Sequence, residues 1–204
     1  EAGAKLVDIN SSRRISHDSI HLDAALERLG FDTIPHVTTR DSSVNGIANH
    51  MLAAREWSDV RNFLIVTGDP YEGNQSIIPS EGVFQTDSIG AIKALHERLR
   101  AGCNPALAVC IAAAVNQNEK ERVKERKRLD EKIEAGADFF MSQPIFSEAQ
   151  ADRLFNFYGT ITDKPLIVGI WPLIHMRTVG AIRSGRVVGV EIPEKEHTKM
   201  CQHA

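Results

Sequence analysis

Short runs of apolar residues alternate along the chain with longer segments in which apolar residues recur every three or four positions. The clearest short run covers residues 62–66 and leads directly into the sequence Thr67-Gly68-Asp69-Pro70. An unbroken apolar run that ends at a Gly/Pro turn is typical of a strand buried on both faces, as parallel sheets require. The turn places the Asp69 carboxylate at the carboxyl end of that strand, where ligands bind in α/β folds. An Asx-type turn without any ligand explains the same sequence about equally well.

The same alternation continues along the chain, with no sign of antiparallel hairpins. Six strands are expected, at residues 5–10, 33–39, 62–66, 106–113, 137–142 and 166–171, and a further apolar run covers residues 187–192. Helices are expected after Ser16, after Ser42 or Ser43, after Asp87 or Ser88, over residues 119–135, after Ser147 and over residues 176–182. Strands that alternate with helices at this spacing indicate a parallel sheet with right-handed crossovers.

Two architectures fit this order of elements: an open doubly wound sheet and a (β/α)8 barrel. No Gly-x-Gly-x-x-Gly sequence follows the first strand, so the open sheet of dinucleotide-binding proteins loses its best sequence support. The strand ends are rich in polar residues, as the catalytic face of a barrel requires. We therefore predict an α/β fold of the (β/α)8 TIM barrel type over residues 1–193, lacking the first and last strands in this chain, and a polar tail over residues 194–204.

Composition narrows the partners that the protein can be expected to have. The chain has 204 residues, 42% hydrophobic and 25% charged, with a net charge of -3, which is ordinary for one large globular domain. A nucleic-acid partner would favour a clearly basic face, and no apolar run reaches the roughly 18 residues of a membrane span. The three cysteines have no metal-binding spacing, so we expect reduced thiols, no metal and a cytoplasmic location.

The carboxyl ends of the predicted strands carry neutral hydrogen-bonding residues and one carboxylate. They are Asn10, Ser11, His36, Thr38, Arg40, Thr67, Asp69, Asn116, Asn118 and Gln143. This set suits a planar, amide-rich ligand better than a hydrolytic reaction, and the sequence has no nucleophile elbow, His-Glu-x-x-His, Cys-x-x-Cys or Walker loop. Each residue also has a structural explanation: His36 as a hydrogen-bonded core histidine, Asn116 and Asn118 as turn formers. Gln143 is the hardest to explain in this way, since a buried amide needs a partner.

Five ordered blocks of sequence resemble the methylenetetrahydrofolate reductase family, most closely the reductase domain of bifunctional homocysteine S-methyltransferase/methylenetetrahydrofolate reductase proteins. The blocks are His36–Asp41, Thr67–Pro70, Gly136–Phe146, Gly169–Pro172 and Val190–Pro193. The resemblance implies a flavoprotein oxidoreductase of one-carbon metabolism and methionine biosynthesis. Such an enzyme carries FAD or FMN and uses NAD(P)H to reduce 5,10-methylenetetrahydrofolate to 5-methyltetrahydrofolate.

The resemblance also assigns roles to individual residues. Asp69 matches an aspartate near the flavin and the folate pterin, where a carboxylate can favour a cationic iminium form of the substrate. Gln143 matches a glutamine that contacts the folate or the nicotinamide. Flavin contacts are implied for Asn10, His36, Thr67, Gly68, Asp69, Phe84, Gln85, Asn116 and Lys132. Lys132 would meet the flavin phosphates, although on sequence alone it is one more charge on a solvated helix.

Two departures from the family pattern leave other functions open. Many family members have Arg where this chain has Thr67, and the general-acid glutamate of the family, on the first barrel strand, has no counterpart from Glu1 onward. The alternatives are a non-catalytic flavin- or folate-binding subunit of the same fold, a barrel methyltransferase that handles a pterin without flavin, and an unrelated barrel. A barrel with two open edges would need a partner surface, so we expect a homo-oligomer or a methyltransferase partner.

Overall fold

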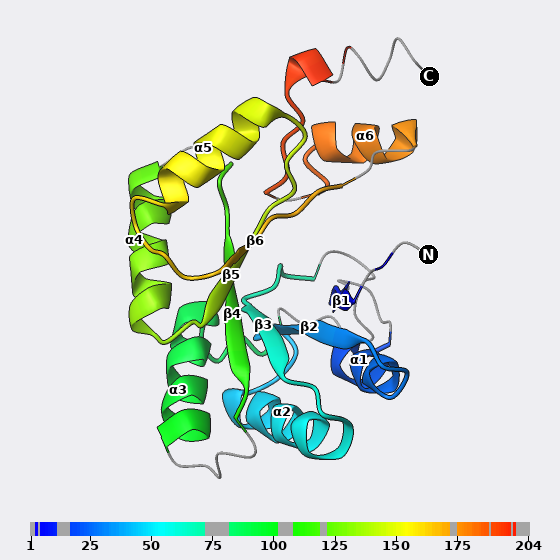
Figure 1. The fold of residues 1–204 in the computed structure, drawn as a ribbon, viewed down its shortest axis with the longest axis vertical. Coiled ribbons are helices and arrows are strands. Elements are labelled where there is room, and N and C mark those ends of the chain that lie inside the picture. Colours follow the sequence, from blue (N-terminus) through cyan, green and yellow to red (C-terminus); the bar gives the residue numbers. More distant parts are fainter. Residues whose placement is uncertain are drawn as a thin grey trace. The chain divides into compact units, whose positions relative to one another are not determined.

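The computed structural model describes residues 3, 5–11, 17–71, 82–101, 108–118, 122–171, 175–187, 189–196 and 198 (Figure 1). Strands and helices alternate in the order β1 Leu6–Ile9, α1 Ser19–Glu27, β2 Asp32–Thr38, α2 Val44–Ser58, β3 Asn62–Val66, α3 Ser88–Ala101, β4 Cys110–Val115, α4 Arg122–Glu134, β5 Phe139–Ser142, α5 Glu148–Tyr158, β6 Leu166–Ile167 and α6 Met176–Arg183. The chain forms two compact units. The first comprises Glu1–Ala113 with Glu131–Asp138, and the second Ala114–Asp130 with Phe139–Ala204.

In the first unit, four parallel strands lie in the order β1-β2-β3-β4. His36 of β2 is paired with Leu64 of β3, and Thr38 with Val66. The register continues beyond the strands, because the Thr39 amide donates to the Val66 carbonyl over 3.1 Å. Parallel strands in this register bring their carboxyl ends to one edge of the sheet, so the residues that follow β2 and β3 lie next to each other.

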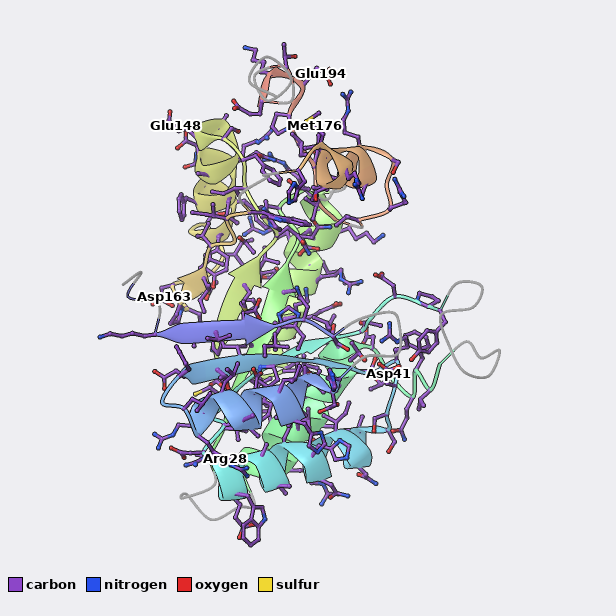
Figure 2. The ribbon with its side chains drawn as sticks, turned by 90° about the vertical axis from the view of Figure 1, so that its right-hand side faces the viewer. Arg28, Asp41, Glu148, Asp163, Met176 and Glu194 are labelled. Atoms are coloured by element: carbon purple, nitrogen blue, oxygen red, sulfur yellow. The ribbon has the colours of Figure 1, made fainter. Side chains whose placement is uncertain are left out.

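The helices of the first unit bury one apolar face each. Helix α1 packs against β2, and α2 packs against α1, on the same side of β1 and β2 (Figure 2). The fully buried side chains include Ile47 and Met51 of α2, and Ile92 and Leu95 of α3. Burial of a side chain of this size stabilises the fold by about 1.5–3 kcal/mol.

Side-chain caps mark the starts of four helices, of which three were predicted and one was not. Asp87 Oδ1 accepts from the Gly90 amide over 2.9 Å at the start of α3, as predicted. The Ser43 and Ser147 side chains accept from the backbone amides three residues later, at the starts of α2 and α5, as predicted. The first helix, expected after Ser16, begins instead at Ser19, where Asp18 accepts from the His21 amide. Ser16 itself, residues 72–81 and residues 199–204 of the tail lie outside the described part of the chain.

In the second unit, the end of β4 lies beside β5, and β5 pairs with β6 in parallel. The Gln143 amide donates to the Val115 carbonyl over 3.1 Å, and Phe140 is paired with Leu166. The Phe140 ring meets the Tyr158 ring of α5 edge-on at 5.8 Å between centroids. Helix α6 has its own small core, made by Val179, Ile182 and Ile192 with the flanking side chains of Phe146, Trp171, Val187 and Val190.

The predicted eight-stranded barrel is wrong. The described residues form six parallel strands with alternating helices, the topology of a partial (β/α) barrel. Residues 187 and 189–192, which belong to an apolar run, do not form a strand, because Gly185 and Gly189 have φ values of 74° and 77°, which interrupt an extended backbone. Ile192 is buried against α6 instead. Among the described helices, none is long and apolar enough to cross a membrane.

Asp23, in the middle of α1, is a buried carboxylate in the first unit. Its side chain is 0% exposed, and neither carboxylate oxygen has a hydrogen-bond partner among the described residues. Burial, and then the negative charges of Asp8, Glu27 and Asp18, raise the pKa of Asp23 to about 7. Asp8 in turn lies 2.5 Å from His36 Nε2, so the basic group that faces this acidic cluster is on β2.

We predict that Asp23 makes the protein less stable as the pH rises. The folded state holds the Asp23 proton up to about pH 7, whereas the unfolded chain releases it near the ordinary value of 3.8. The free energy of unfolding should therefore fall between these two values and then level off. Asp23→Asn removes this titration, and at about pH 8 it should be more stable than the wild type by about 1–3 kcal/mol.

Denaturant unfolding at about pH 5 and about pH 8 measures this effect. Asp130→Asn, at an exposed position of α4, is the matched control and should follow the wild type at both pH values. Equal pH dependence of Asp23→Asn and the wild type would show that Asp23 does not titrate abnormally.

Candidate functional site

The polar residues that follow β2 and β3 form a connected cluster at the carboxyl edge of the first unit. Thr39 and Arg40 follow β2 and are both buried, whereas Thr67, Gly68 and Asp69 follow β3 and are partly buried. The Thr39 hydroxyl donates to the Thr67 carbonyl over 3.2 Å, which ties the two strand ends together. The predicted site residues Thr67, Gly68 and Asp69 are therefore held in one place by residues from the neighbouring strand.

An ion pair between Arg40 and Asp41 is the centre of this cluster. Arg40 Nε donates to Asp41 Oδ1 over 2.8 Å, and Arg40 Nη2 donates to Asp41 Oδ2 over 2.7 Å. The Thr38 hydroxyl also donates to Asp41 Oδ2, over 2.7 Å. Burial raises the pKa of Asp41, but the hydrogen bonds from Arg40, Tyr71 and Thr38 outweigh it and leave the pKa below its ordinary value. Asp41, at the carboxyl end of β2 (Figure 2), is thus an ionised partner for Arg40 at neutral pH.

Arg40 also reaches across to the segment that follows β3. Its Nη1 donates to the Asp69 carbonyl over 3.2 Å, and its guanidinium carbon lies 4.5 Å from the centre of the Tyr71 ring. The Tyr71 hydroxyl donates to Asp41 Oδ1, so Arg40 contacts the face of the ring and Asp41 binds its hydroxyl. A guanidinium stacked on a ring and paired with a carboxylate gains cation–π and charge-assisted hydrogen-bond energy together. The backbone of Asp69 is therefore fixed by its neighbours.

Gly68 permits the close approach of the two strand ends. Its φ of 81° lies in the left-handed region, and a Cβ atom there would be 3.1 Å from Thr38 Cβ and 3.2 Å from Arg40 Cβ. A residue with a side chain would be strained and crowded at this position.

Three other predicted flavin contacts have hydrogen bonds or backbone conformations of their own. Thr67 Oγ1 accepts from the Ser88 amide over 3.0 Å, and Gln85 Oε1 accepts from the Val44 amide over 3.0 Å. These two side chains therefore satisfy the free amides at the starts of α3 and α2. Phe84 has a φ of 36°, a conformation that residues with a side chain rarely adopt and that is often found at functional sites.

The remaining predicted contacts of the first unit lie in different surroundings. Asn10 is exposed just beyond β1. His36 is partly buried in β2, where its Nε2 approaches Asp8 without hydrogen-bond geometry. Lys132 is only 5% exposed, so the interpretation that it is a charge on a solvated helix face is wrong. A buried ammonium group needs a negative or polar partner.

The second unit brings together Asn116 and Gln143. Gln117 Nε2 donates to the Gln143 carbonyl over 2.6 Å, and Gln117 Oε1 accepts from the Gln143 amide over 3.0 Å. This reciprocal pair fixes the backbone from which the Gln143 side chain projects. A Cβ atom on Gly189 would lie 3.4 Å from the Gln143 side-chain amide and 3.6 Å from Asn116 Nδ2, so both amides border Gly189.

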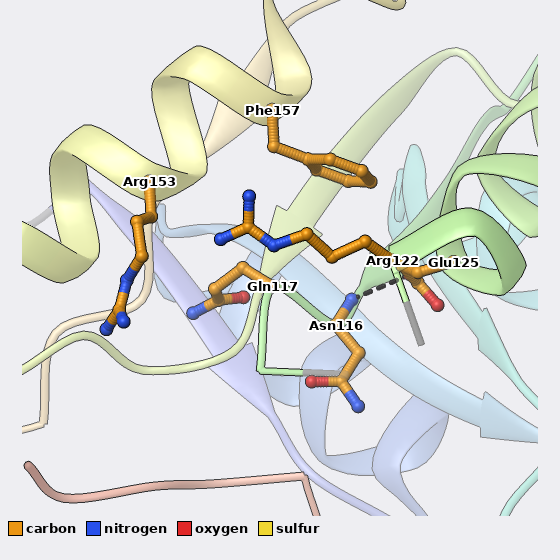
Figure 3. Close-up of a pocket in the computed structure, with 6 residues that line it drawn as sticks. All are labelled: Asn116, Gln117, Arg122, Glu125, Arg153 and Phe157. Atoms are coloured by element: carbon orange, nitrogen blue, oxygen red, sulfur yellow. Dashed lines mark hydrogen bonds between the residues drawn. The ribbon is translucent and has the colours of Figure 1, made fainter. Parts of the chain in front are cut away.

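A small pocket in the second unit lies between α4 and α5 (Figure 3). It is lined by Asn116, Gln117, Arg122, Glu125, Arg153 and Phe157. Glu125 is buried, and its Oε1 accepts from the Asn116 amide over 2.9 Å, which holds the strand end against α4. The Arg122 side chain extends between Phe157 and Gln117. In the part of the chain that the structure describes, no group of three His, Cys, Asp or Glu residues is placed to hold a metal ion.

Sequence reasoning names the candidate contacts but misses the side chains that support the backbone around them. Arg40 and Asp41 belong to the sequence block His36–Asp41, and Arg40 follows a predicted strand. The local pattern does not predict that the two side chains pair with each other. Gln117 was overlooked because it lies between two asparagines that could simply form a turn. In both cases, a polar side chain next to a predicted contact in the sequence could have indicated the supporting residue.

Comparisons with known proteins give a family and a fold. The family model for methylenetetrahydrofolate reductase matches residues 6–202. Among solved structures, an oxaloacetate acetylhydrolase aligns over 95% of this chain and 79% of its own, with a TM-score of 0.52 and 15% identity. A phosphonopyruvate hydrolase aligns over 93% of this chain and 75% of its own, with a TM-score of 0.51 and 15% identity. At these identities the structural similarity concerns the fold alone.

We predict that Gly68→Ala destabilises the protein more than Gly30→Ala does. Both glycines have left-handed φ values, 81° and 88°, but a Cβ at Gly30 would have no atom within 4 Å. The backbone strain of about 1–2 kcal/mol is common to both variants. The additional loss in Gly68→Ala, about 1 kcal/mol or more, measures the contact with Thr38 and Arg40. Equal losses in denaturant unfolding would show that this approach is not tight.

Proposed function

The chain belongs to the methylenetetrahydrofolate reductase family, and we propose that it reduces 5,10-methylenetetrahydrofolate to 5-methyltetrahydrofolate with NAD(P)H and a bound flavin. The observation that carries this proposal is the family match over residues 6–202. Within the family, the sequence blocks favour the reductase domain of the bifunctional homocysteine S-methyltransferase proteins. The proposed cofactor is FAD, with FMN as the alternative.

Several features of the first unit support a flavin site. Gly68 lets the ends of β2 and β3 approach closely beside Asp69, and the unusual backbone of Phe84 lies at a second expected contact. The buried Lys132 ammonium suits the phosphates of the cofactor. The flavin, when bound, would carry the hydride from NAD(P)H to the folate.

Asp69 is the residue to which we assign the main catalytic role. Its carboxylate would accept a hydrogen bond from the pterin and stabilise the positive charge of the iminium form of the substrate. Because Asp41 already neutralises Arg40, the guanidinium near Asp69 adds little net positive charge.

Gln143 and Asn116 are proposed to contribute amide groups to ligand binding. Gln117 binds both backbone groups of Gln143, so the backbone that carries the Gln143 side chain is held in place before a ligand arrives. A side-chain amide carries both donors and an acceptor, which match the edges of a pterin or a nicotinamide carboxamide. We assign Gln143 to the folate or the nicotinamide, and Asn116 to the flavin.

We predict that Asp69→Asn separates the two halves of the reaction. Reduction of the flavin by NAD(P)H should stay within about threefold of the wild-type rate, because it needs no cationic folate. Reduction of methylenetetrahydrofolate should slow by about 100-fold or more, the usual loss when a preorganised electrostatic group is removed. Stopped-flow absorbance without oxygen measures both rates.

Asp152→Asn, at an exposed position of α5, is the control and should leave both rates unchanged. Equal slowing of both half-reactions by Asp69→Asn would contradict the assigned role. Binding of flavin or folate without turnover would favour the non-catalytic binding protein instead.

A further inference from the structure

Arg40 contacts the polypeptide on both sides of residues 72–81. On one side, its Nη1 donates to the Asp69 carbonyl, and its guanidinium stacks on Tyr71. On the other side, its own carbonyl accepts from the Val83 amide over 2.6 Å. A Cβ atom on Gly82 would lie 2.8 Å from Arg40 Cγ, so the Arg40 stem also touches this second segment.

The two segments that Arg40 contacts both carry expected flavin contacts. The first includes Thr67, Gly68 and Asp69, and the second leads into Phe84, whose ring is also 2.8 Å from the position of a Gly82 Cβ. A larger residue at Gly82 would therefore collide with Arg40 and Phe84 at once. One side chain thus connects two parts of the candidate site that are well separated in the sequence.

Arg40 is buried and held by several partners, so it can fix the position of the segments that it contacts. It is 2% exposed, and a buried guanidinium without partners would cost several kcal/mol. Its fork is fixed on Asp41, which is itself held by Thr38 and Tyr71. A lysine could not bind both Asp41 oxygens and the Asp69 carbonyl together, because its ammonium is a single point rather than a planar fork.

We propose that Arg40 is a positioning residue that sets the arrangement of Thr67–Asp69 and Phe84 for the flavin and the folate. This inference rests on the proposed function for the identity of the ligands, but its geometry does not. Arg40 acts through Asp69 and Phe84. The pair with Asp41 keeps the charge balanced, so the effect of Arg40 is on position more than on potential.

Hydrogen–deuterium exchange of the cofactor-free protein tests the positioning directly. In Arg40→Ala, which removes both the guanidinium and Cγ, the amides of residues 67–71 and 83–86 should exchange about tenfold faster or more, while the rest of the first unit stays unchanged. Arg55→Ala is the matched control, because Arg55 is also paired with a carboxylate, Asp59, and donates to a carbonyl, that of Ala108. Exchange that is unchanged, or raised in only one of the two segments, would overturn the proposal.

A double-mutant cycle tests the link to function. If Arg40 acts on folate reduction through Asp69, the double variant of Arg40→Lys and Asp69→Asn should reduce folate within about threefold of the rate of Asp69→Asn alone. Multiplied losses would show that Arg40 acts independently of Asp69 and would overturn this part of the proposal. Absence of flavin binding in the wild type would refute the proposed function, while the exchange experiment would still decide whether Arg40 positions the two segments.

Discussion

Burial of the Arg40 guanidinium is the constraint on which the candidate site depends. A charge that is 2% exposed is tolerated only when its donors are satisfied, and Asp41, the Asp69 carbonyl and the Tyr71 ring together meet that need. Each of these partners is fixed in return. The glycine at position 68 follows from the same arrangement, since any side chain there would press on Thr38 and Arg40.

In the second unit, a neutral side chain holds the backbone beyond a strand end in a comparable way. Gln117 binds the amide and the carbonyl of Gln143, just as Arg40 binds the carbonyl of Asp69. In each unit, a side chain that follows one strand holds the backbone that follows the next strand. Parallel strands make this arrangement natural, because all their carboxyl ends reach the same edge of a sheet. The residues proposed to touch the ligands are thus placed by residues that need not touch them.

The sequence was most informative where structure depends on neighbouring residues. The strand at Asn62–Val66 and the caps Ser43 and Ser147 follow from local pattern and were predicted. The apolar run at residues 187–192 left its structure open, since its apolar residues pack in the core of α6 and Gly189 has a positive φ. The burial of Lys132 and the reach of Arg40 to Asp69, 29 positions away, depend on tertiary contacts that no local pattern records.

The most direct test of the account is a visible absorption spectrum of the purified protein with FAD, followed by NAD(P)H and then methylenetetrahydrofolate, without oxygen. The account predicts a flavin band near about 450 nm that bleaches with NAD(P)H and returns when the folate is added. A protein that binds neither FAD nor FMN under these conditions would contradict the assignment of this chain as a flavin-dependent folate reductase.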